Sequence, residues 1–463
     1  MQRSSKTTLL WVWLWVLAGI GLLGTTVWKS TQPTIQGAPI AEIRAVLPRE
    51  LLTEPTPPNR AAEHRFQEVE SIALRLDANE VLQVCELATK QTGVASGRDD
   101  GLRRRIHSIF QANPGILQRL RSLLKRGPLA YPQDRSTEAA LDEFRVFAFT
   151  RLLTAGVLTY AHQDQFQASI DMLDLTTLLD DRLMASGGTT LSYETLLVAE
   201  AQAIATVASV VMTPGIPASS CRHILAALRP SPYPDEYLAN AIRRDFDLIE
   251  LPCLPDPKSE RAMIALGIPA RQRSEAISRM VGNYDAIETA KALGIATVVE
   301  IKNARRPISE FDESAHRMLA RLEIPDRPNT TGKAGPLKAL LDRAYVLKMN
   351  RIPNSLGRQC FLFGSHALSL FERISDGWRT TRDLVRISLA ARIYRGDHGG
   401  RLPPTTDGFL PLLGAWPKDP YNGKPMVYRP ERTIAYSVGP GLVDTGGTIG
   451  DPRKLQVTGI LLK

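Results

Sequence analysis

Two residues at one place in this chain have the spacing needed for acyl transfer. Ser122 and Lys125 match the S-x-x-K pattern of an acylating serine and the lysine beside it. Enzymes built on this pair also carry S-D-N and K-T-G elements, and the sequence contains neither. A two-residue match arises easily by chance, so this spacing alone does not predict catalysis.

Other catalytic and metal-binding patterns are missing from the sequence as well. It has no nucleophile elbow, zinc-protease motif or glycine-rich phosphate loop in a suitable context. Its seven histidines are scattered, and no two stand at the spacing of metal ligands. Asp180 and Asp181 are adjacent, so they point in different directions on a helix and are expected to face water. The sequence therefore predicts a protein that is not an enzyme.

Segment 103–126 is the most basic part of a chain whose formal net charge is +9. Its pattern predicts one amphipathic helix, whose basic face could bind an anionic polymer or nucleic acid. A solvated helix face is the alternative, because runs of charge usually face water. Phe110 is its only aromatic ring of the Phe, Tyr or Trp type, so base stacking is not supported. The basic residues are Arg103, Arg104, Arg105, Arg119, Arg121, Lys125 and Arg126.

Glu200 is the only charged residue in the apolar segment 195–221. A buried core helix is expected there, and a second membrane span is the alternative. A lone buried carboxylate is costly, so Glu200 needs a cationic partner. Arg145 and Arg151, in the preceding helical segment, are the predicted partners.

Residues 382–462 contain the most distinctive order of elements. Apolar residues at helical spacing predict an amphipathic helix at 382–394, with Arg382, Asp383 and Arg386 on its solvent side. Turn-forming residues and short apolar runs follow, so the sequence predicts this helix packed on a small antiparallel sheet. A break near 375–377 is expected to separate it from a helix at 361–378, and strands are expected at 426–429, 434–438 and 456–462.

Four stretches of this region resemble the head domain of a type II secretion major pseudopilin. They are a helix exit with Tyr and Gly, an LPxT-like stretch, a PxDPxxGxPxxY-like loop and a YSxGxDGxxGG-like loop, at 394–400, 402–405, 417–428 and 436–447. The resemblance implies a pilin-like α+β fold and a role in secretion or pilus-type assembly. The whole chain also looks like an anchored envelope protein with a helical body and a pilin-like tail. It departs from pseudopilins in lacking their processed leader and in inserting the helical body after the anchor.

Pseudopilin heads of this type bind calcium in their last loop, and the resemblance assigns Asp444 to that site. Hard cations need several oxygen ligands from carboxylates and carbonyl groups. Gly441 and Thr445 stand where the family has further acidic residues. The resemblance therefore implies calcium at Asp444, and a metal-free loop shaped by its glycines is the alternative. The sequence suggests no other cofactor.

The N-terminus carries the signals of a membrane anchor. Arg3 and Lys6 precede an uncharged run that extends to Trp28. About 20 apolar residues can cross a bilayer as a helix, so residues 8–28 are predicted to span a membrane. Basic residues before the run place the N-terminus in the cytoplasm. The prediction is a single-pass protein of a bacterial inner membrane with its bulk in the periplasm. A cleaved signal peptide is the alternative, although the run is long for one.

The chain has four cysteines: Cys85, Cys221, Cys253 and Cys360. In an oxidising compartment they permit two disulfides. Cys221 and Cys253 flank one helical segment and are the first predicted pair. Free buried thiols are the alternative.

At 463 residues, with 43% hydrophobic and 23% charged residues, the chain has the composition of a folded protein with about three domains. Several prolines within 30–60 predict an extended, semi-rigid stalk. The predicted fold class is mainly α. Its parts are a cytoplasmic tip and anchor (1–29), the stalk (30–60), an all-helical body (61–377, with possible boundaries at 251–257 and 325–336) and a small α+β module (378–463).

Two function hypotheses follow from the sequence. The first is a membrane-anchored extracytoplasmic structural or interaction protein, with protein partners of the cell envelope and a link to type II secretion or pilus-type assembly. The alternative is a binding module for an anionic polymer or nucleic acid, which uses the basic surface of segment 103–126.

Overall fold

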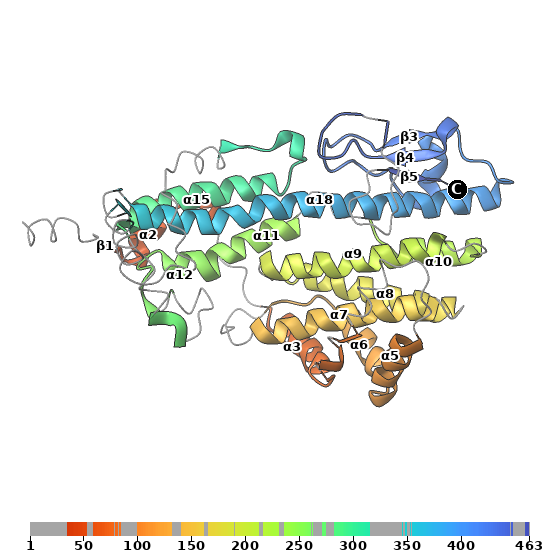
Figure 1. Cartoon of the computed structure of the whole chain (residues 1–463), viewed down its shortest axis with the longest axis horizontal. Helices are drawn as coiled ribbons and strands as arrows, with labels where there is room; N and C mark the ends of the chain where they lie inside the picture. The colour runs from red at the N-terminus through yellow and green to blue at the C-terminus, as the bar shows by residue number, and fades with distance from the viewer. Residues whose placement is uncertain are drawn as a thin grey trace, which may run out of the picture. The chain divides into compact units, whose positions relative to one another are not determined.

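The computed structural model is mainly helical, with a small antiparallel sheet near its C-terminus (Figure 1). The chain divides into two compact units. Unit 1 comprises 1–52, 249–296 and 314–365, and unit 2 comprises 53–248, 297–313 and 366–463. The structure describes residues 35–52, 59–77, 79–81, 83–84, 100–131, 140–161, 165–188, 190–212, 216–230, 236–260, 262, 271–274, 282–314, 345, 348–349, 352, 354–444, 446–447 and 459–462.

In unit 1, the described part of the predicted stalk is not extended throughout. Helix α2 (Ile40–Val46) and the 3-10 helix η1 (Arg49–Leu51) form there, with Leu51 buried. Pro39 and Pro48 directly precede these two helices, where the missing proline N–H removes no helical hydrogen bond. The expectation of extended structure was therefore wrong for Ile40–Val46 and Arg49–Leu51.

A polar junction in unit 1 joins the beginnings of two long helices, α15 (Ala286–Asn303) and α18 (Ser355–Asp397). Asn354 has a positive φ of 45°, and its Oδ1 accepts a hydrogen bond from the Asp285 backbone N–H at 2.9 Å. Its Nδ2 donates to Thr289 Oγ1 at 3.0 Å. The same region contains a short parallel pair, β1 (Ile35–Gln36) with β2 (Tyr284–Asp285).

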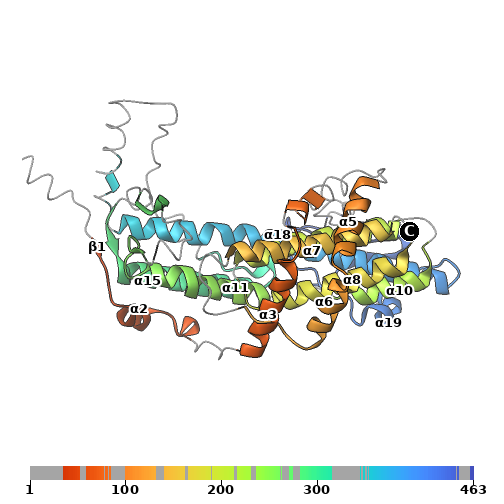
Figure 2. The same cartoon turned by 90° about the horizontal axis from the view of Figure 1, so that it is seen from below.

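Unit 2 is built on a layer of packed helices. Helix α7 packs on α8 and α9, α10 packs on α8, and α3 and α5 pack on α7 (Figure 1, Figure 2). A buried core helix, as predicted within 195–221, is present as α9, which contributes Ile204 and Val207 to the core. It ends at Met212, and residues 218–221 begin the separate helix α10. The bounds are α3 (Arg60–Ala73), α5 (Asp100–Ala112), α6 (Ile116–Lys125), α7 (Ala140–Ala161), α8 (Phe166–Met184), α9 (Thr190–Met212), α10 (Ala218–Ala227) and α11 (Glu236–Asp245).

The single helix predicted at 103–126 was wrong, because α5 and α6 are separate. Gly115 between them has a φ of +77°, a conformation that glycine adopts without strain. Asn113 Nδ2 donates to the Ile109 carbonyl at 2.9 Å and so satisfies a carbonyl at the end of α5.

The predicted break near 375–377 was also wrong. Helix α18 is continuous over 43 residues, and the predicted domain boundary between 377 and 378 falls inside it. Thr380 Oγ1 donates to the Asp376 carbonyl at 2.8 Å, and Thr381 Oγ1 donates to the Gly377 carbonyl at 2.9 Å. A glycine inside a helix costs only about 1 kcal/mol, which burial on several sides can offset.

The predicted small sheet is confirmed. Strands β3 (Val427–Arg429), β4 (Ile434–Tyr436) and β5 (Gly459–Leu461) pair antiparallel in the order β3-β4-β5. Short helical turns, η5 (Thr406–Phe409), α19 (Leu410–Leu413) and η6 (Pro430–Arg432), connect the elements. Residues of α18 and of the sheet belong to the same hydrophobic core as those of α7 to α10.

The predicted placement as a single-pass inner-membrane protein is corrected by the structure. Within the part of the chain that the structure describes, no helix is both long enough and apolar enough to cross a bilayer. The predicted span at residues 8–28 lies outside the described residues.

Candidate functional site: a buried polar seam along α18

The C-terminal half of α18 carries charged side chains into the interior of unit 2. From Asp376 to Ala391 every residue is buried except Ser388, which is half-buried. The sequence placed Arg382, Asp383 and Arg386 on the solvent side, and this was wrong. All three are buried, because the protein covers this face of the helix with its own helices.

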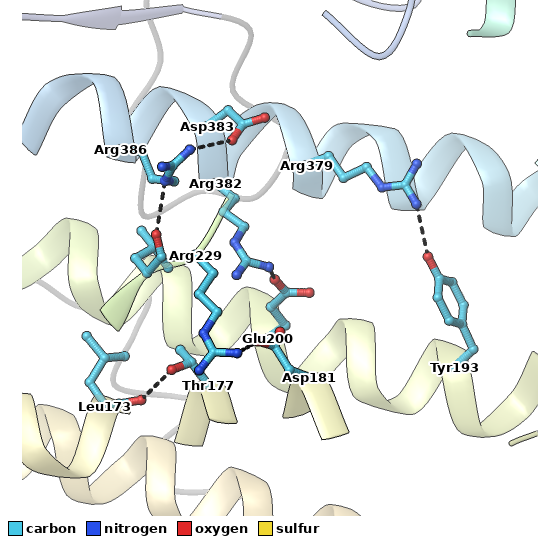
Figure 3. A network of polar contacts seen from close by, with 11 residues as sticks. Leu173, Thr177, Asp181, Tyr193, Glu200, Arg229, Arg379, Arg382, Asp383 and Arg386 are labelled. Atoms are coloured by element: carbon cyan, nitrogen blue, oxygen red, sulfur yellow. Dashed lines mark hydrogen bonds and ion pairs between the residues drawn. The ribbon is translucent and has the colours of Figure 1, made fainter. Parts of the chain in front are cut away.

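Arg382 is the partner of Glu200. Its Nη1 atom bonds to Glu200 Oε1, so an ion pair joins α18 to α9 across 182 positions in the sequence (Figure 3). Arg151, one of the two predicted partners of Glu200, was a wrong prediction. Its Nε donates to Gln202 Oε1 at 3.2 Å instead. The side chain of Arg145 lies outside the described residues.

Two further arginines, Arg379 and Arg386, lie on either side of Arg382 along α18. We call these three arginines and the groups that they bond the polar seam. Arg379 donates to Tyr193 Oη on α9 at 3.3 Å and pairs with Asp376 at 3.3 Å. Arg386 donates from Nε to the Leu228 carbonyl, just after α10, at 2.9 Å. It also pairs with Asp383 of its own helix at 3.6 Å. Figure 3 shows the three guanidinium groups reaching from α18 toward the helices that cover it.

Asp180 on α8 is a buried acid of this region, and neither oxygen of its carboxyl group has a hydrogen-bond partner among the described residues. Burial raises its pKa well above the ordinary value; Glu200 and Asp181 raise it further, and Arg382 opposes them. The expectation that both adjacent acids face water was wrong for Asp180. Asp181 is partly exposed and pairs with Arg229 at 2.9 Å.

The seam leaves little free space. Tyr193, Tyr237 and Trp378 line a cavity beside Glu200 and Arg382, with about 10 Å³ available to the centre of a water molecule. That is room for about one water, whereas organic ligands occupy pockets of several hundred Å³. The arrangement can hold helices together, and this cavity cannot admit an organic substrate.

The predicted metal ligand Asp444 already has protein partners. Its Oδ1 accepts hydrogen bonds from Tyr436 Oη and from the Gly446 backbone N–H, both at 2.9 Å. These bonds, the Gly446 one first, lower the pKa of Asp444. In the described ranges, no group of three or more His, Cys, Asp or Glu side chains is arranged to hold a metal ion. Thr445 lies outside them, and calcium binding stays a prediction.

Asp419, in the loop at 417–428, is buried and its carboxylate bonds to the loop itself and to the end of strand β4. Its Oδ1 accepts from the Tyr421 N–H at 3.0 Å and from Ser437 Oγ at 2.9 Å, and its Oδ2 accepts from the Val438 N–H at 2.8 Å. Burial raises its pKa, and these three bonds oppose that change. The Asp-Pro step before Asn422 and Gly423 was the available signal.

The residues of α5 and α6 divide into a buried and an exposed side. Ile106, Ile109, Leu120 and Leu124 are buried in the core. Arg121 donates to the Asp171 carbonyl at 3.0 Å. The exposed basic residues are Arg104, Arg105, Arg119, Lys125 and Arg126.

Two sets of residues that the sequence singled out are not brought together as it suggested. Ser122 and Lys125 are exposed on α6, so no enclosed site surrounds them. No disulfide joins Cys221 to Cys253, and the predicted pair was wrong. The side chains of Cys85 and Cys360 lie outside the described residues.

No family model, no curated protein and no solved structure matches this chain. The resemblance of residues 394–447 to pseudopilin heads therefore stays a prediction.

Proposed function

We propose that this chain is a structural or interaction protein rather than an enzyme, and that its protein partners belong to pilus-type or type II secretion machinery. The observation that carries the first part is the seam on α18. Its arginines bond to protein groups inside unit 2, so they serve to unite helices. The second part rests on the resemblance of residues 394–447 to pseudopilin heads.

The C-terminal module offers a partner a defined contact. Val443 is 63% exposed and Leu442 is 43% exposed, side by side on the loop after β4. The bonds that Asp444 accepts from Tyr436 and Gly446 hold the base of this loop. A partner that binds apolar side chains on a preorganised loop loses less entropy than one that binds a mobile loop.

Site-specific photocrosslinking in cells tests this function. A photoreactive residue is placed at Val443 or, as the control, at the exposed Arg119 on α6. We expect crosslinks from position 443 to pilin-like or secretion-system subunits and none to these subunits from position 119. No crosslink to such subunits from position 443, in a variant that is folded and expressed, would contradict the proposal.

The basic surface of α5 and α6 supports a second candidate function, the binding of an anionic polymer. The supporting observation is that five basic residues face outward while the apolar sides of both helices are buried. Binding through phosphate or carboxylate groups would fall steeply as salt concentration rises.

A charge-reversal pair tests this second candidate. Arg119→Glu combined with Lys125→Glu should weaken binding of a fluorescent DNA oligonucleotide or of heparin, and should reduce its salt dependence. The control is Lys418→Glu combined with Lys424→Glu. It changes the net charge equally, at exposed sites in a loop of the C-terminal module. Equal loss in both variants would show that only net charge matters, and no loss in the first would exclude a site on α6.

A further inference from the structure

One ion pair, and one carboxyl group without a hydrogen bond to the described residues, lie in this part of unit 2. Met184, one turn after Asp180 on α8, lines the same small cavity as Glu200 of α9 and Arg382 of α18. Asp180 on α8 is buried, Glu200 on α9 bonds to Arg382, and Arg382 on α18 is itself buried. Glu200 and Arg382 both act electrostatically on Asp180, with opposite signs. With both carboxyl groups ionised, the cluster would hold one negative charge too many in a region of low dielectric constant.

Neighbouring charges do not compensate Asp180. Asp181 on its own helix adds a like charge, although Arg229 pairs with that carboxylate. Arg151 on α7 bonds to Gln202. On α10, Arg222 pairs with Asp397, and His223 is exposed. On α18, Asp376 pairs with Arg379 and Asp383 pairs with Arg386. Arg392, Arg395 and Asp397 lie further along the helix, and none of them acts on Asp180.

We propose that Asp180, Glu200 and Arg382 form a proton-operated latch that holds α18 against α8 and α9. With a proton on Asp180, the cluster contains one carboxylate and one guanidinium, and the seam is tight. Loss of that proton leaves two carboxylates for one guanidinium, and the seam loosens. The inference concerns how the seam is held, so it goes beyond the proposed function and does not depend on a partner.

The direction of the pH effect follows from proton linkage. Folding raises the pKa of Asp180 above its ordinary value, so the closed seam binds the proton more tightly than the open one. The free energy that keeps the seam closed therefore falls as pH rises from the ordinary pKa to the raised one, and is constant above it. Within this window, each rise of one pH unit increases the equilibrium constant for opening of the seam about tenfold.

Hydrogen exchange of the full chain measures this opening. Exchange of the backbone amides of 382–391 is followed by mass spectrometry from mildly acidic to mildly alkaline buffer, with rates divided by the intrinsic rate at each pH. We expect wild-type protection to fall with pH and protection in Asp180→Asn to stay level. Asp174→Asn, at an exposed aspartate of the same helix α8, is the matched control, and it should behave as the wild type does. A fall of equal size in wild type and Asp180→Asn would overturn the latch.

A second variant keeps the test decisive if Asp180→Asn does not fold. Glu200→Gln removes the like charge beside Asp180 and frees Arg382 to interact with it. Asp180 should then ionise at lower pH, so the fall in protection should begin at lower pH whatever the absolute stability of the variant. If protection in Glu200→Gln fell at the same pH as in the wild type, the latch would be rejected. Neither readout requires a partner, so failure here leaves the proposed function untouched.

Discussion

A charged side chain on an amphipathic helix can face water or a second polar surface, and the helix pattern alone does not distinguish the two. Arg382 has the same chemistry in both situations, but here it meets Glu200 on α9. The need of Glu200 for a cation was deduced from its apolar surroundings, whereas the identity of that cation depended on a contact across 182 positions. At this scale, the burial of a partner decides how much a substitution costs.

Glu200→Gln should destabilise the protein in acidic buffer, in which Asp180 keeps its proton, because it leaves Arg382 as a buried charge without a carboxylate. Removal of one partner of a buried pair costs about 3–5 kcal/mol. Glu236→Gln is the control, because its pair with Arg305 is partly exposed and should be worth at most about 1 kcal/mol. Urea unfolding followed by circular dichroism measures both. Equal, small losses would show that the buried pair contributes no more than the exposed one.

Asp419→Ala should destabilise the C-terminal module. Three donors, the N–H groups of Tyr421 and Val438 and the hydroxyl of Ser437, lose their acceptor. We expect a loss of about 2–4 kcal/mol in the free energy of unfolding. Asp407→Ala, at an exposed aspartate of the same module, should change stability by less than about 0.5 kcal/mol. Similar thermal unfolding of the two variants would contradict the conclusion that the hydrogen bonds of Asp419 stabilise the module.

At the scale of elements, α18 differs most from its sequence pattern. Gly377 and the polar residues around it resemble a helix break, yet the helix continues because buried contacts on several sides offset the local propensity. Segment 103–126 shows the opposite case. Its helical periodicity continues across Pro114 and Gly115, but Gly115 adopts a positive φ and the chain forms two helices.

Amide exchange along α18 distinguishes one helix from two. The backbone N–H groups of 376–391 should exchange among the slowest in the protein, without a fast-exchanging gap at 375–377, because buried helix interiors open only rarely. Residues 398–401, exposed after the end of α18, serve as the fast-exchanging reference. A gap of rapid exchange at 375–377 would restore the two-helix prediction.

At the scale of the whole molecule, two compact units are each assembled from three stretches of the chain. A disulfide between Cys221 and Cys253 would have joined unit 2 to unit 1 covalently, because the two cysteines belong to different units. No disulfide joins these two cysteines, so this covalent link between the units is not made.

In a Cys85→Ser, Cys360→Ser variant, reduction should leave the melting temperature unchanged, because Cys221 and Cys253 form no disulfide. Thermal melting with and without dithiothreitol measures this, and peptide mapping without reduction should show no Cys221–Cys253 peptide. Recovery of that linked peptide, together with a lower melting temperature after reduction, would reverse the conclusion.

The sequence by itself determined the helical class, the core helix around Glu200, the small sheet after residue 426 and its connection at 430–432. These depend on local periodicity and turn chemistry, which short segments carry. Tertiary structure alone decided that the charged face of α18 is buried, that Arg382 is the partner of Glu200 and that Asp180 is buried without a hydrogen bond to any described residue. Those facts depend on how distant helices pack, and a local pattern does not specify which distant helix will cover a given face.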